Sequence, residues 1–420
     1  MNRLCKPEWY ENVATILAYT SPALGHMLPM SALLSELSHR GHTIHLRTLS
    51  SAVDMAARLG FDTAAIDPRI ESIPLGDGDT TDPRRALQIG VAAFGRRAVH
   101  EVTDLGAAIA DVAPDALLID VNCWGARSAA EAGDIPWACF SPYTPPMQSP
   151  GVPPFGLGLK PIPGALGRAR DAAIQAVVSR SIEKALLPAV NRIRADVGLP
   201  AVKSADEYLR RAPLMFVATG KPFQYEQTDW GDAVHMIGPC ALDPASETTC
   251  DWLAEIDRPL VLVTTSSEPQ ADAELVSTAV AALADEPVHV IATVPTGPLE
   301  DFTTSPNTTV CGMVPHEAVL ARAVCAITHG GMGATQKALL HGVPVCVVPF
   351  GRDQFEVARR VEVARCGTRL PAKKLTAPRL RTKVQQAQAM TDGAKRVAAG
   401  FEATGGTSRG ADLFEQRILR

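Results

Sequence analysis

The chain has 420 residues, with 40 basic against 45 acidic side chains and a formal net charge of −5. This balance gives no reason to expect nucleic acid or an anionic membrane surface as the main partner. Hydrophobic residues make up 46% of the chain and charged residues 20%. These shares are ordinary for a globular protein, and the length favours two domains over one.

Targeting and redox features predict a cytoplasmic protein. The first ten residues contain no apolar run that could form a signal-peptide core. No stretch of the chain reaches the ~20 apolar residues that a membrane span needs. The nine cysteines are scattered, without a Cys-x-x-Cys pair. We therefore expect small buried thiols in a reducing compartment, not a disulfide framework or a zinc site.

Short β-branched runs alternate with amphipathic helices in the first half of the chain. The patterns predict strands at 13–19, 43–48, 116–120 and 135–140, and helices at 28–40 and 124–132. This alternation is typical of a doubly wound parallel sheet. The stretch 141–164 is rich in proline and glycine, which predicts a long loop, and a helix is expected over about 165–197.

The same alternation restarts in the second half. Predicted strands lie at 260–265, 288–293, 308–311, 324–328 and 343–348. Two such series predict an α/β protein with two Rossmann-like, doubly wound parallel-sheet domains that face a cleft. The expected boundaries are an N-terminal acceptor-side domain at 1–235, a linker at 236–250, a C-terminal domain at 251–400, and a C-terminal helix at 401–420 that could cross back to the N-terminal domain.

The strongest local signal is the segment Ala326–Thr335, where a predicted strand ends, a glycine turn follows and a helix begins. Glycines let the backbone approach a ligand closely, and the free N–H groups of a first helical turn suit a diphosphate. His329 could donate to a phosphate oxygen and Thr335 could add a hydroxyl. The glycines alone fit a tight strand-to-helix turn equally well.

Two polar side chains follow the next predicted strand. Asp353 and Gln354 place a carboxylate beside an amide, and this pair is suited to adjacent sugar hydroxyls. Asp353 could equally be a helix N-cap, and both roles could hold at once.

The stretch from Gly312 to Gln354 resembles the donor-binding signature of the family-1 glycosyltransferases with the GT-B fold. These include bacterial antibiotic and macrolide enzymes and plant natural-product enzymes. The resemblance implies a UDP- or TDP-linked sugar as co-substrate, with no other cofactor and no metal. It assigns the diphosphate to Ser267, His329, Gly331, Gly333, Ala334 and Thr335. It assigns the nucleobase to Met313, Val314 and His316, and the donor sugar to Asp353 and Gln354.

The chain departs from that signature at three positions. Met313 stands where many relatives stack a tryptophan on the base, and Ser266 stands where a glycine is usual. Lys337 occupies the place of a glutamate that usually accepts hydrogen bonds from ribose hydroxyls. Because a lysine has no acceptor, it cannot recognise ribose in that way, and the preferred nucleotide is left open. A surface lysine without a ligand role fits this position at least as well.

On the N-terminal side, His26 follows a glycine after the first predicted strand, and Asp120 closes another strand of the same sheet. The segment around His26 resembles the family's Gly-His-x-x-Pro motif, which implies that His26 is the catalytic base and that Asp120 orients it. A neutral imidazole can take a proton from an acceptor hydroxyl, and a neighbouring carboxylate stabilises the imidazolium that forms. Without the resemblance, a lone histidine after a strand is more often structural.

The predicted reaction is direct displacement at the anomeric carbon with inversion. The predicted acceptor is a small hydrophobic, natural-product-like molecule with a hydroxyl group. The loop 141–164 carries Phe155 and Leu157, which could wall an apolar acceptor pocket, although ordinary loop packing is an equal alternative. The sequence leaves open a homodimer.

Other functions are less well supported. Asp77, Asp79 and Asp82 resemble an acidic metal motif, but they lie in a polar turn without a preceding strand. The first strand–helix turn has only Gly25, which argues against a dinucleotide site. A glycosyltransferase-like helper without catalysis of its own, binding a partner enzyme, and a nucleotide-sugar epimerase remain as alternatives. The paired His26 and Asp120 argue against the helper.

Overall fold

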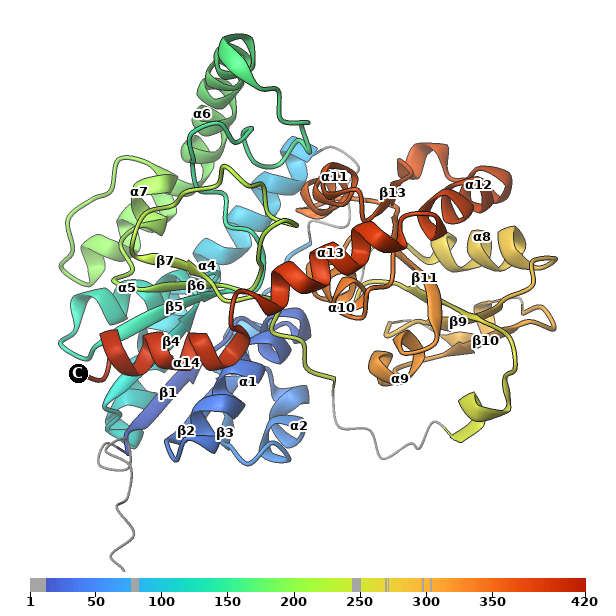
Figure 1. The fold of residues 1–420 in the computed structure, drawn as a ribbon. Coiled ribbons are helices and arrows are strands. Elements are labelled where there is room, and N and C mark those ends of the chain that lie inside the picture. The colour runs from blue at the N-terminus through green and yellow to red at the C-terminus, as the bar shows by residue number, and fades with distance from the viewer. Residues whose placement is uncertain are drawn as a thin grey trace, which may run out of the picture.

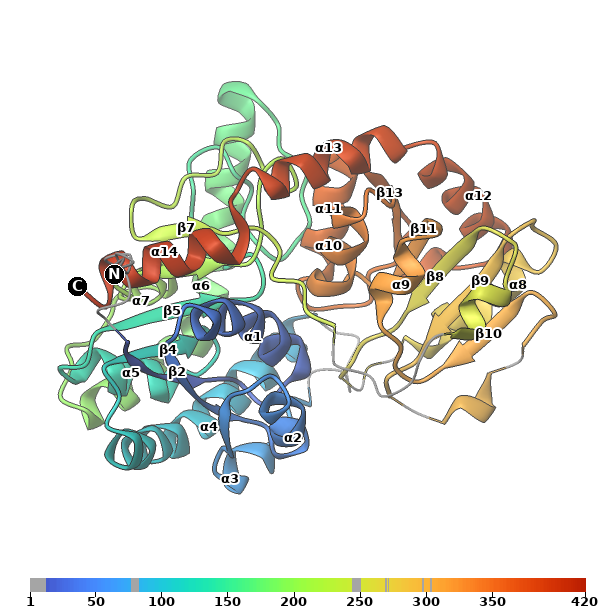
Figure 2. The ribbon, with the colours of Figure 1, turned by 60° about the horizontal axis from the view of Figure 1, so that its bottom comes forward.

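The computed structural model describes residues 13–76, 83–243, 251–268, 270, 272–296, 298–302 and 304–420. Two α/β lobes lie side by side, each built on one sheet (Figures 1 and 2). Within the described residues the N-terminal sheet has the order β3-β2-β1-β4-β5-β6-β7 and the C-terminal sheet the order β10-β9-β8-β11-β12-β13. The strand pairs of both sheets are parallel, so the predicted fold class is confirmed.

The N-terminal lobe alternates strands and helices from the first strand to β5. Its strands are β1 (Thr15–Tyr19), β2 (Thr43–Thr48), β3 (Asp62–Ala65), β4 (Ala116–Asp120), β5 (Trp137–Ser141), β6 (Met215–Val217) and β7 (Val234–Met236). Its helices are α1 (Leu24–His39), α2 (Val53–Ala57), α3 (Pro68–Glu71), α4 (Pro83–Val112), α5 (Trp124–Ala132), α6 (Gly164–Asp196) and α7 (Ala205–Leu209).

The C-terminal lobe repeats this alternation. Its strands are β8 (Leu260–Thr264), β9 (His289–Thr293), β10 (Thr308–Cys311), β11 (Ala323–Thr328), β12 (Val345–Val347) and β13 (Gly367–Arg369). Its helices are α8 (Ala273–Leu283), α9 (His316–Leu320), α10 (Met332–Leu340), α11 (Gln354–Ala364), α12 (Ala377–Gln388) and α13 (Thr391–Glu402), and α14 (Gly406–Arg417) follows.

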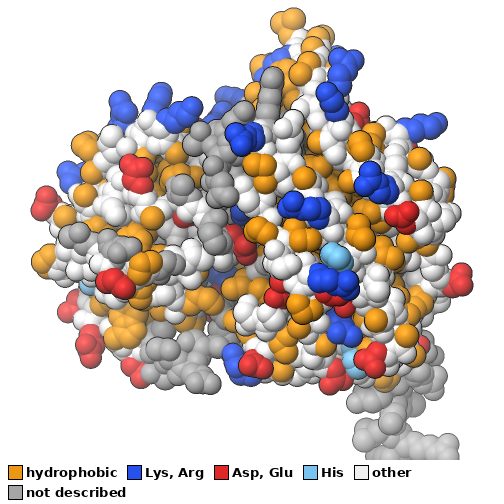
Figure 3. All heavy atoms as spheres, turned by 180° about the vertical axis from the view of Figure 1, so that it is seen from behind, with side chains coloured by type: hydrophobic (Ala, Val, Ile, Leu, Met, Phe, Trp, Pro, Cys, Tyr) orange, Lys and Arg blue, Asp and Glu red, His pale blue; other side chains and the backbone are white. Residues whose placement is uncertain are grey.

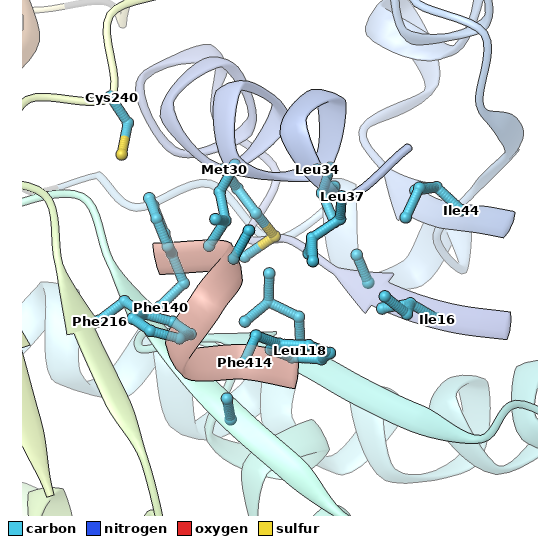
Figure 4. Close-up of a cluster of buried hydrophobic side chains, with 14 of the residues drawn as sticks. Ile16, Met30, Leu34, Leu37, Ile44, Leu118, Phe140, Phe216, Cys240 and Phe414 are labelled. Atoms are coloured by element: carbon cyan, nitrogen blue, oxygen red, sulfur yellow. The ribbon is translucent and has the colours of Figure 1, made fainter. Parts of the chain in front are cut away.

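Helices cover both faces of each sheet, which explains why the central strands read as continuous apolar runs. Every residue of β4 and of β8 is buried. One apolar cluster joins α1 to the N-terminal sheet, and Figure 4 shows Phe414 of α14 among its members, beside Phe216 and Phe140. The C-terminal α14 therefore lies in the core of the N-terminal lobe, where it packs against α1.

The strand order places the reactive edge of each lobe. In the N-terminal sheet the order reverses between the neighbours β1 and β4, and in the C-terminal sheet between β8 and β11. Ligands of doubly wound sheets bind beyond the carboxyl ends of the strands at such reversals. Asp120 is the last residue of β4, and the segments after β1, β8 and β11 carry His26, Ser267 and His329.

Helix α6 projects from the N-terminal lobe (Figure 1), and hydrophobic and basic side chains cover the tip of this projection when it is seen from behind (Figure 3). Leu166 and Val177 of α6 are strongly exposed. No helix in the described part of the chain is both long and apolar enough to cross a membrane. The cysteines that the structure describes carry free thiols, most of them buried, as predicted.

Candidate active site

His26 and Asp120 form a hydrogen-bonded pair at the edge of the N-terminal sheet. His26 lies in the first turn of α1, and Asp120 is the last residue of β4, the strand that neighbours β1. The Nδ1 atom of His26 lies 2.7 Å from Oδ2 of Asp120, whose side chain is fully buried. Because a carboxylate can only accept, Nδ1 carries the proton and Nε2 holds the lone pair.

The electrostatics of this pair suit a base. Burial lowers the pKa of His26, but the surrounding carboxylates, Asp120 above all, together outweigh burial and hold the pKa above its ordinary value. Asp353 and Glu268 of the C-terminal lobe act in the same direction. The two lobes therefore bring the predicted base of one sheet near the predicted sugar-binding carboxylate of the other.

Two side chains that sequence reasoning missed complete this edge. The carboxamide Nδ2 of Asn122 lies 3.4 Å from Nε2 of His26, and the Tyr143 hydroxyl donates to Oδ1 of Asn122 over 2.6 Å. The tyrosine ring also meets the His26 ring edge-on, with centroids 5.9 Å apart. Asn122 stands two residues after Asp120, and its place just past a strand end was the one signal that could have indicated it.

In the C-terminal lobe, His329 follows β11 and is buried against the end of β8. Its Nδ1 lies 3.4 Å from the backbone oxygen of Thr264, which only accepts, so Nδ1 carries the proton. Burial lowers the pKa of His329 to about 4, and the neutral ring leaves Nε2 as an acceptor. Donation from Nε2 to a phosphate oxygen therefore requires the ring to take up a proton, which a nearby diphosphate charge would favour.

The turn before α10 needs glycine. A Cβ atom on Gly331 would lie 2.5 Å from Nε2 of His329, whereas a Cβ on Gly333 would meet open space. Gly333 is exposed and Ala334 half-buried, so the first turn of α10 has free backbone at its open end. Thr335 is fully buried, and its hydroxyl lies 3.0 Å from that of Thr328.

The predicted sugar pair lies at the start of α11. Asp353 stands at the N-cap position but makes no side-chain capping bond, and burial raises its pKa. Gln354 is buried, and its Oε1 accepts from the backbone N–H groups of Phe350 and Gly351 at 2.8 and 3.0 Å. Its Nε2 donates to Gln270 over 3.0 Å. Gln354 thus shapes the loop that presents Asp353.

The residues predicted to hold the nucleobase lie together from the turn after β10 to the first residue of α9. Met313 is 44% exposed, while Val314 packs partly against the lobe core. Nε2 of His316 lies 3.1 Å from the Thr293 hydroxyl, and burial lowers the pKa of His316 to about 4. Ser267, in the loop after β8, is half-buried.

Lys337 of α10 is neither a surface lysine nor unpartnered. Its ammonium group pairs with the carboxylate of Asp243 and donates to the backbone oxygen of Leu242 over 3.2 Å. Burial alone would raise the pKa of Asp243, but Lys337 holds it below its ordinary value. Asp243 also accepts from the backbone N–H of Glu317 at the start of α9, over 2.8 Å.

The proline- and glycine-rich loop crosses to the other lobe. Oε1 of Glu356, on α11, accepts from the backbone N–H groups of Gly156 and Gly158 at 2.9 and 2.8 Å. Phe155 is half-buried and Leu157 is 52% exposed. The loop predicted to wall the acceptor is therefore fastened to the helix that begins with the predicted sugar pair.

Among the described residues, no three side chains of the metal-binding types gather into a group that could hold a metal ion. The acidic turn with Asp77, Asp79 and Asp82 lies outside the described residues, as do 244–250 of the expected linker.

Comparison with known proteins identifies the family. The model described as "Erythromycin biosynthesis protein CIII-like, C-terminal domain" matches residues 275–405. The chain is 31% identical over 390 residues to 4'-demethylrebeccamycin synthase of Lentzea aerocolonigenes, covering 89% of this chain and 91% of that protein. It is 26% identical over 409 residues to the NDP-glycosyltransferase YjiC of Bacillus subtilis, covering 94% and 95%.

Solved structures agree on the architecture. The glycosyltransferase of kitacinnamycin superposes with a TM-score of 0.74 at 24% identity, covering 97% of this chain and 100% of that one. The calicheamicin glycosyltransferase CalG4 gives 0.71 at 22% identity, covering 97% and 99%. Two Rossmann-like lobes of this kind define the GT-B class. The chain belongs to the family-1 glycosyltransferases with this fold, and it is therefore an enzyme that transfers glycosyl groups.

Proposed function

We propose that the chain is an inverting glycosyltransferase that moves a sugar from a UDP- or TDP-linked donor to a hydroxyl of a small hydrophobic, natural-product-like acceptor. The observation that carries this proposal is the His26–Asp120 pair, with Nδ1 held at 2.7 Å and Nε2 directed away from the carboxylate. Asp353 lies near enough across the lobes to raise the pKa of His26.

The proposed step is one displacement. Nε2 of His26 takes the proton of the acceptor hydroxyl while its oxygen attacks the anomeric carbon, and the bond from that carbon to the diphosphate oxygen breaks. A single displacement inverts the anomeric centre. Asp120 stabilises the imidazolium that forms.

The leaving diphosphate is assigned to the turn before α10. The open first turn at Gly333 and Ala334, together with a protonated His329, would meet the charge that develops on the leaving oxygens. The proposed reaction relies on these groups and uses no metal, so that a chelator is expected to leave the rate unchanged.

The nature of the acceptor is supported by the relatives. One has the name 4'-demethylrebeccamycin synthase, another is a demethyllactenocin mycarosyltransferase and a third an oleandomycin glycosyltransferase. These names describe transfer to natural-product-like molecules, and the side chains Phe155 and Leu157 of the loop that binds α11 fit an apolar acceptor.

The test is a transfer assay with UDP- and TDP-linked sugars and a panel of hydroxylated polycyclic and macrolide acceptors. Wild-type protein should form product with inverted anomeric configuration, read by NMR coupling constants. His26→Ala should lower kcat by about 10²- to 10⁴-fold, as expected for loss of a general base.

Calorimetric titration of His26→Ala with UDP and TDP is the control. His26 belongs to the N-terminal lobe and the predicted nucleotide site to the C-terminal lobe, so the variant should bind the nucleotide as tightly as wild type. Retained configuration in the product, or near-normal transfer by His26→Ala with intact nucleotide binding, would overturn the proposed mechanism. Absence of transfer from every UDP- and TDP-linked donor would overturn the proposed donor class.

A further inference from the structure

The side-chain amide of Asn122 faces Nε2, the reactive nitrogen of His26. Nε2, the atom that must receive the acceptor proton, lies 3.4 Å from Nδ2 of Asn122. The backbone N–H of the same asparagine donates to Oδ1 of Asp120 over 2.8 Å. Asn122 is therefore fixed at both its backbone and its side chain to the two members of the pair.

Tyr143 decides which end of the amide faces the histidine. Its hydroxyl donates to Oδ1 of Asn122 over 2.6 Å, and burial raises the pKa of the Tyr143 phenol, so the proton stays on it. With Oδ1 engaged by a donor, the NH₂ group of Asn122 points to Nε2 of His26. The amide thus donates toward a lone pair instead of competing for a proton.

This orientation opposes protonation of His26 before the substrate arrives. The charged groups around the ring are Asp120 from β4, Asp353 from the start of α11 and Glu268 from the loop after β8, and all three favour the imidazolium. An N–H group directed at Nε2 favours the neutral ring, because a protonated Nε2 would face another donor. Asn122 therefore opposes the effect of the three carboxylates on the His26 pKa and helps to keep Nε2 unprotonated.

We propose that Asn122, held by Tyr143, seats the acceptor hydroxyl: its Nδ2–H donates to the acceptor oxygen while Nε2 of His26 accepts the proton of that oxygen. Two nitrogens 3.4 Å apart leave room for one oxygen within hydrogen-bond distance of both. The inference rests on the proposed function, which it deepens by naming the group that positions the nucleophile.

The seat also defines the acceptor group that fits it. The acceptor atom must donate a proton to His26 and accept one from Asn122 at once, and a hydroxyl does both. In the reaction the acceptor O–H bond breaks toward Nε2, and an oxygen electron pair forms the bond to the anomeric carbon. The bond from that carbon to the diphosphate breaks, with its electrons going to the phosphate oxygen. Asn122 keeps the oxygen in line and neither gains nor loses a proton.

The experiment uses Asn122→Ala and the isosteric Asn122→Asp in the full chain, with Tyr143→Phe as the variant that only frees the amide. The first readout is the ring-proton NMR titration of His26 in the free protein, assigned from the signal missing in His26→Gln. The His26 pKa should rise in Asn122→Ala, rise further in Asn122→Asp, and rise least in Tyr143→Phe. This readout needs no substrate, so it holds even if the proposed transfer fails.

The second readout is the pH profile of transfer. As the pH increases, kcat/KM should rise when His26 loses its proton, and in the variants this rise should move to higher pH by the same amount as the His26 pKa. The acceptor KM of Asn122→Ala should increase about five- to tenfold, as expected for one lost hydrogen bond. The donor KM should stay as in wild type. An unchanged His26 pKa in both Asn122 variants would overturn the contact, and a shifted pKa with an unchanged acceptor KM would overturn the seat.

Discussion

At the scale of single residues, Lys337 stands where the family signature has a glutamate, and neighbouring groups neutralise its charge. Its ammonium group binds Asp243 and the backbone of Leu242 at the end of the described linker, and only 13% of its side chain is exposed. The lysine therefore ties α10, which carries the predicted diphosphate turn, to the chain that joins the lobes. Its role in the structure is that of a tether.

The tether predicts a stability effect that depends on pH. Lys337→Met leaves Asp243 part-buried with one backbone donor, which should cost about 1–3 kcal/mol. The folded pKa of Asp243 is depressed, so the pair's contribution is complete above the unfolded carboxyl pKa of about 3.9 and is lost as the pH falls through the lower folded value. The difference in Tm between wild type and variant should thus be full at neutral pH and shrink in acid below that value.

Thermal unfolding over this pH range, followed by fluorescence, is the measurement. Lys373→Met, which removes an exposed lysine, is the control and should leave Tm unchanged. A difference that stays constant into acid would show that Lys337 acts through packing instead of its charge.

The sequence could place His26, Asp120 and His329 because their positions follow from where strands end. Their roles remain predictions, while the contact of His26 with Asp120 and the contact of His329 with the end of β8 are observed. Contacts between distant segments left no such signal. Tyr143 lies 21 residues from Asn122, and Lys337 lies 94 residues from Asp243. No local pattern reports which side chains meet across such separations.

At the scale of elements, the loop 141–164 is fastened to α11 through backbone groups. Gly158 adopts φ +56°, and a Cβ atom there would lie 2.4 Å from the backbone oxygen of Phe355. Arg359 donates to the oxygen of Gly158 over 2.8 Å, in addition to the bonds to Glu356. The loop can therefore follow α11, and with it the predicted sugar pair, as one unit.

Gly158→Ala should lift the loop from α11. Loss of hydrogen bonds worth about 1 kcal/mol each predicts a rise in acceptor KM of roughly tenfold or more. The donor nucleotide affinity should be unchanged, because the loop is bound to α11 whereas the predicted diphosphate turn precedes α10. Steady-state kinetics with both substrates varied separate the two effects.

Gly151→Ala is the matched control, since Gly151 also has a positive φ, of +76°, but its Cβ would only touch Gln227 at an ordinary 3.5 Å. Equal effects of the two variants on the acceptor KM would mean that loop strain, and not its seat on α11, sets acceptor binding.

Most strands with apolar patterns were predictable, whereas the edge strands β3 and β13 were not. The predicted strands at 43–48, 116–120 and 308–311 coincide with β2, β4 and β10. The edge strand β3 has no buried residue, and β13 has the sequence Gly-Thr-Arg, so neither carries a hydrophobic signal. Both segments form strands because the neighbouring strands, β2 and β12, offer unpaired backbone N–H and C=O groups. The sequence of the segment itself does not report this pairing.

At the scale of the whole molecule, the end of the chain links the two lobes. Helix α13 packs on α10 in the C-terminal lobe, and α14 then packs on α1 in the N-terminal lobe (Figure 2). Arg40 at the end of α1 binds Asp412 and Glu415 of α14 at 2.7 and 3.0 Å. The N-terminal core therefore closes only when the last residues of the chain are in place.

Phe414 makes this dependence testable. Its side chain is fully buried, with its ring centroid 6.5 Å from that of Phe216. Phe414→Ala should cost about 3–5 kcal/mol, because the cavity lies in a packed core. Since that core belongs to the N-terminal lobe, the loss should appear there first. Hydrogen exchange read by mass spectrometry should show lost protection in α1 and β6, with α10 unaffected.

Phe401→Ala is the paired variant, because Phe401 is the same side chain on α13 but is buried in the core of the C-terminal lobe. Its loss of protection should fall on α10 and β12 instead. If Phe414→Ala and Phe401→Ala each loosened both lobes to the same degree, the molecule would unfold as one cooperative unit. The crossing segment would then couple the stabilities of the lobes, and any lobe movement during transfer would have to occur without loosening either core.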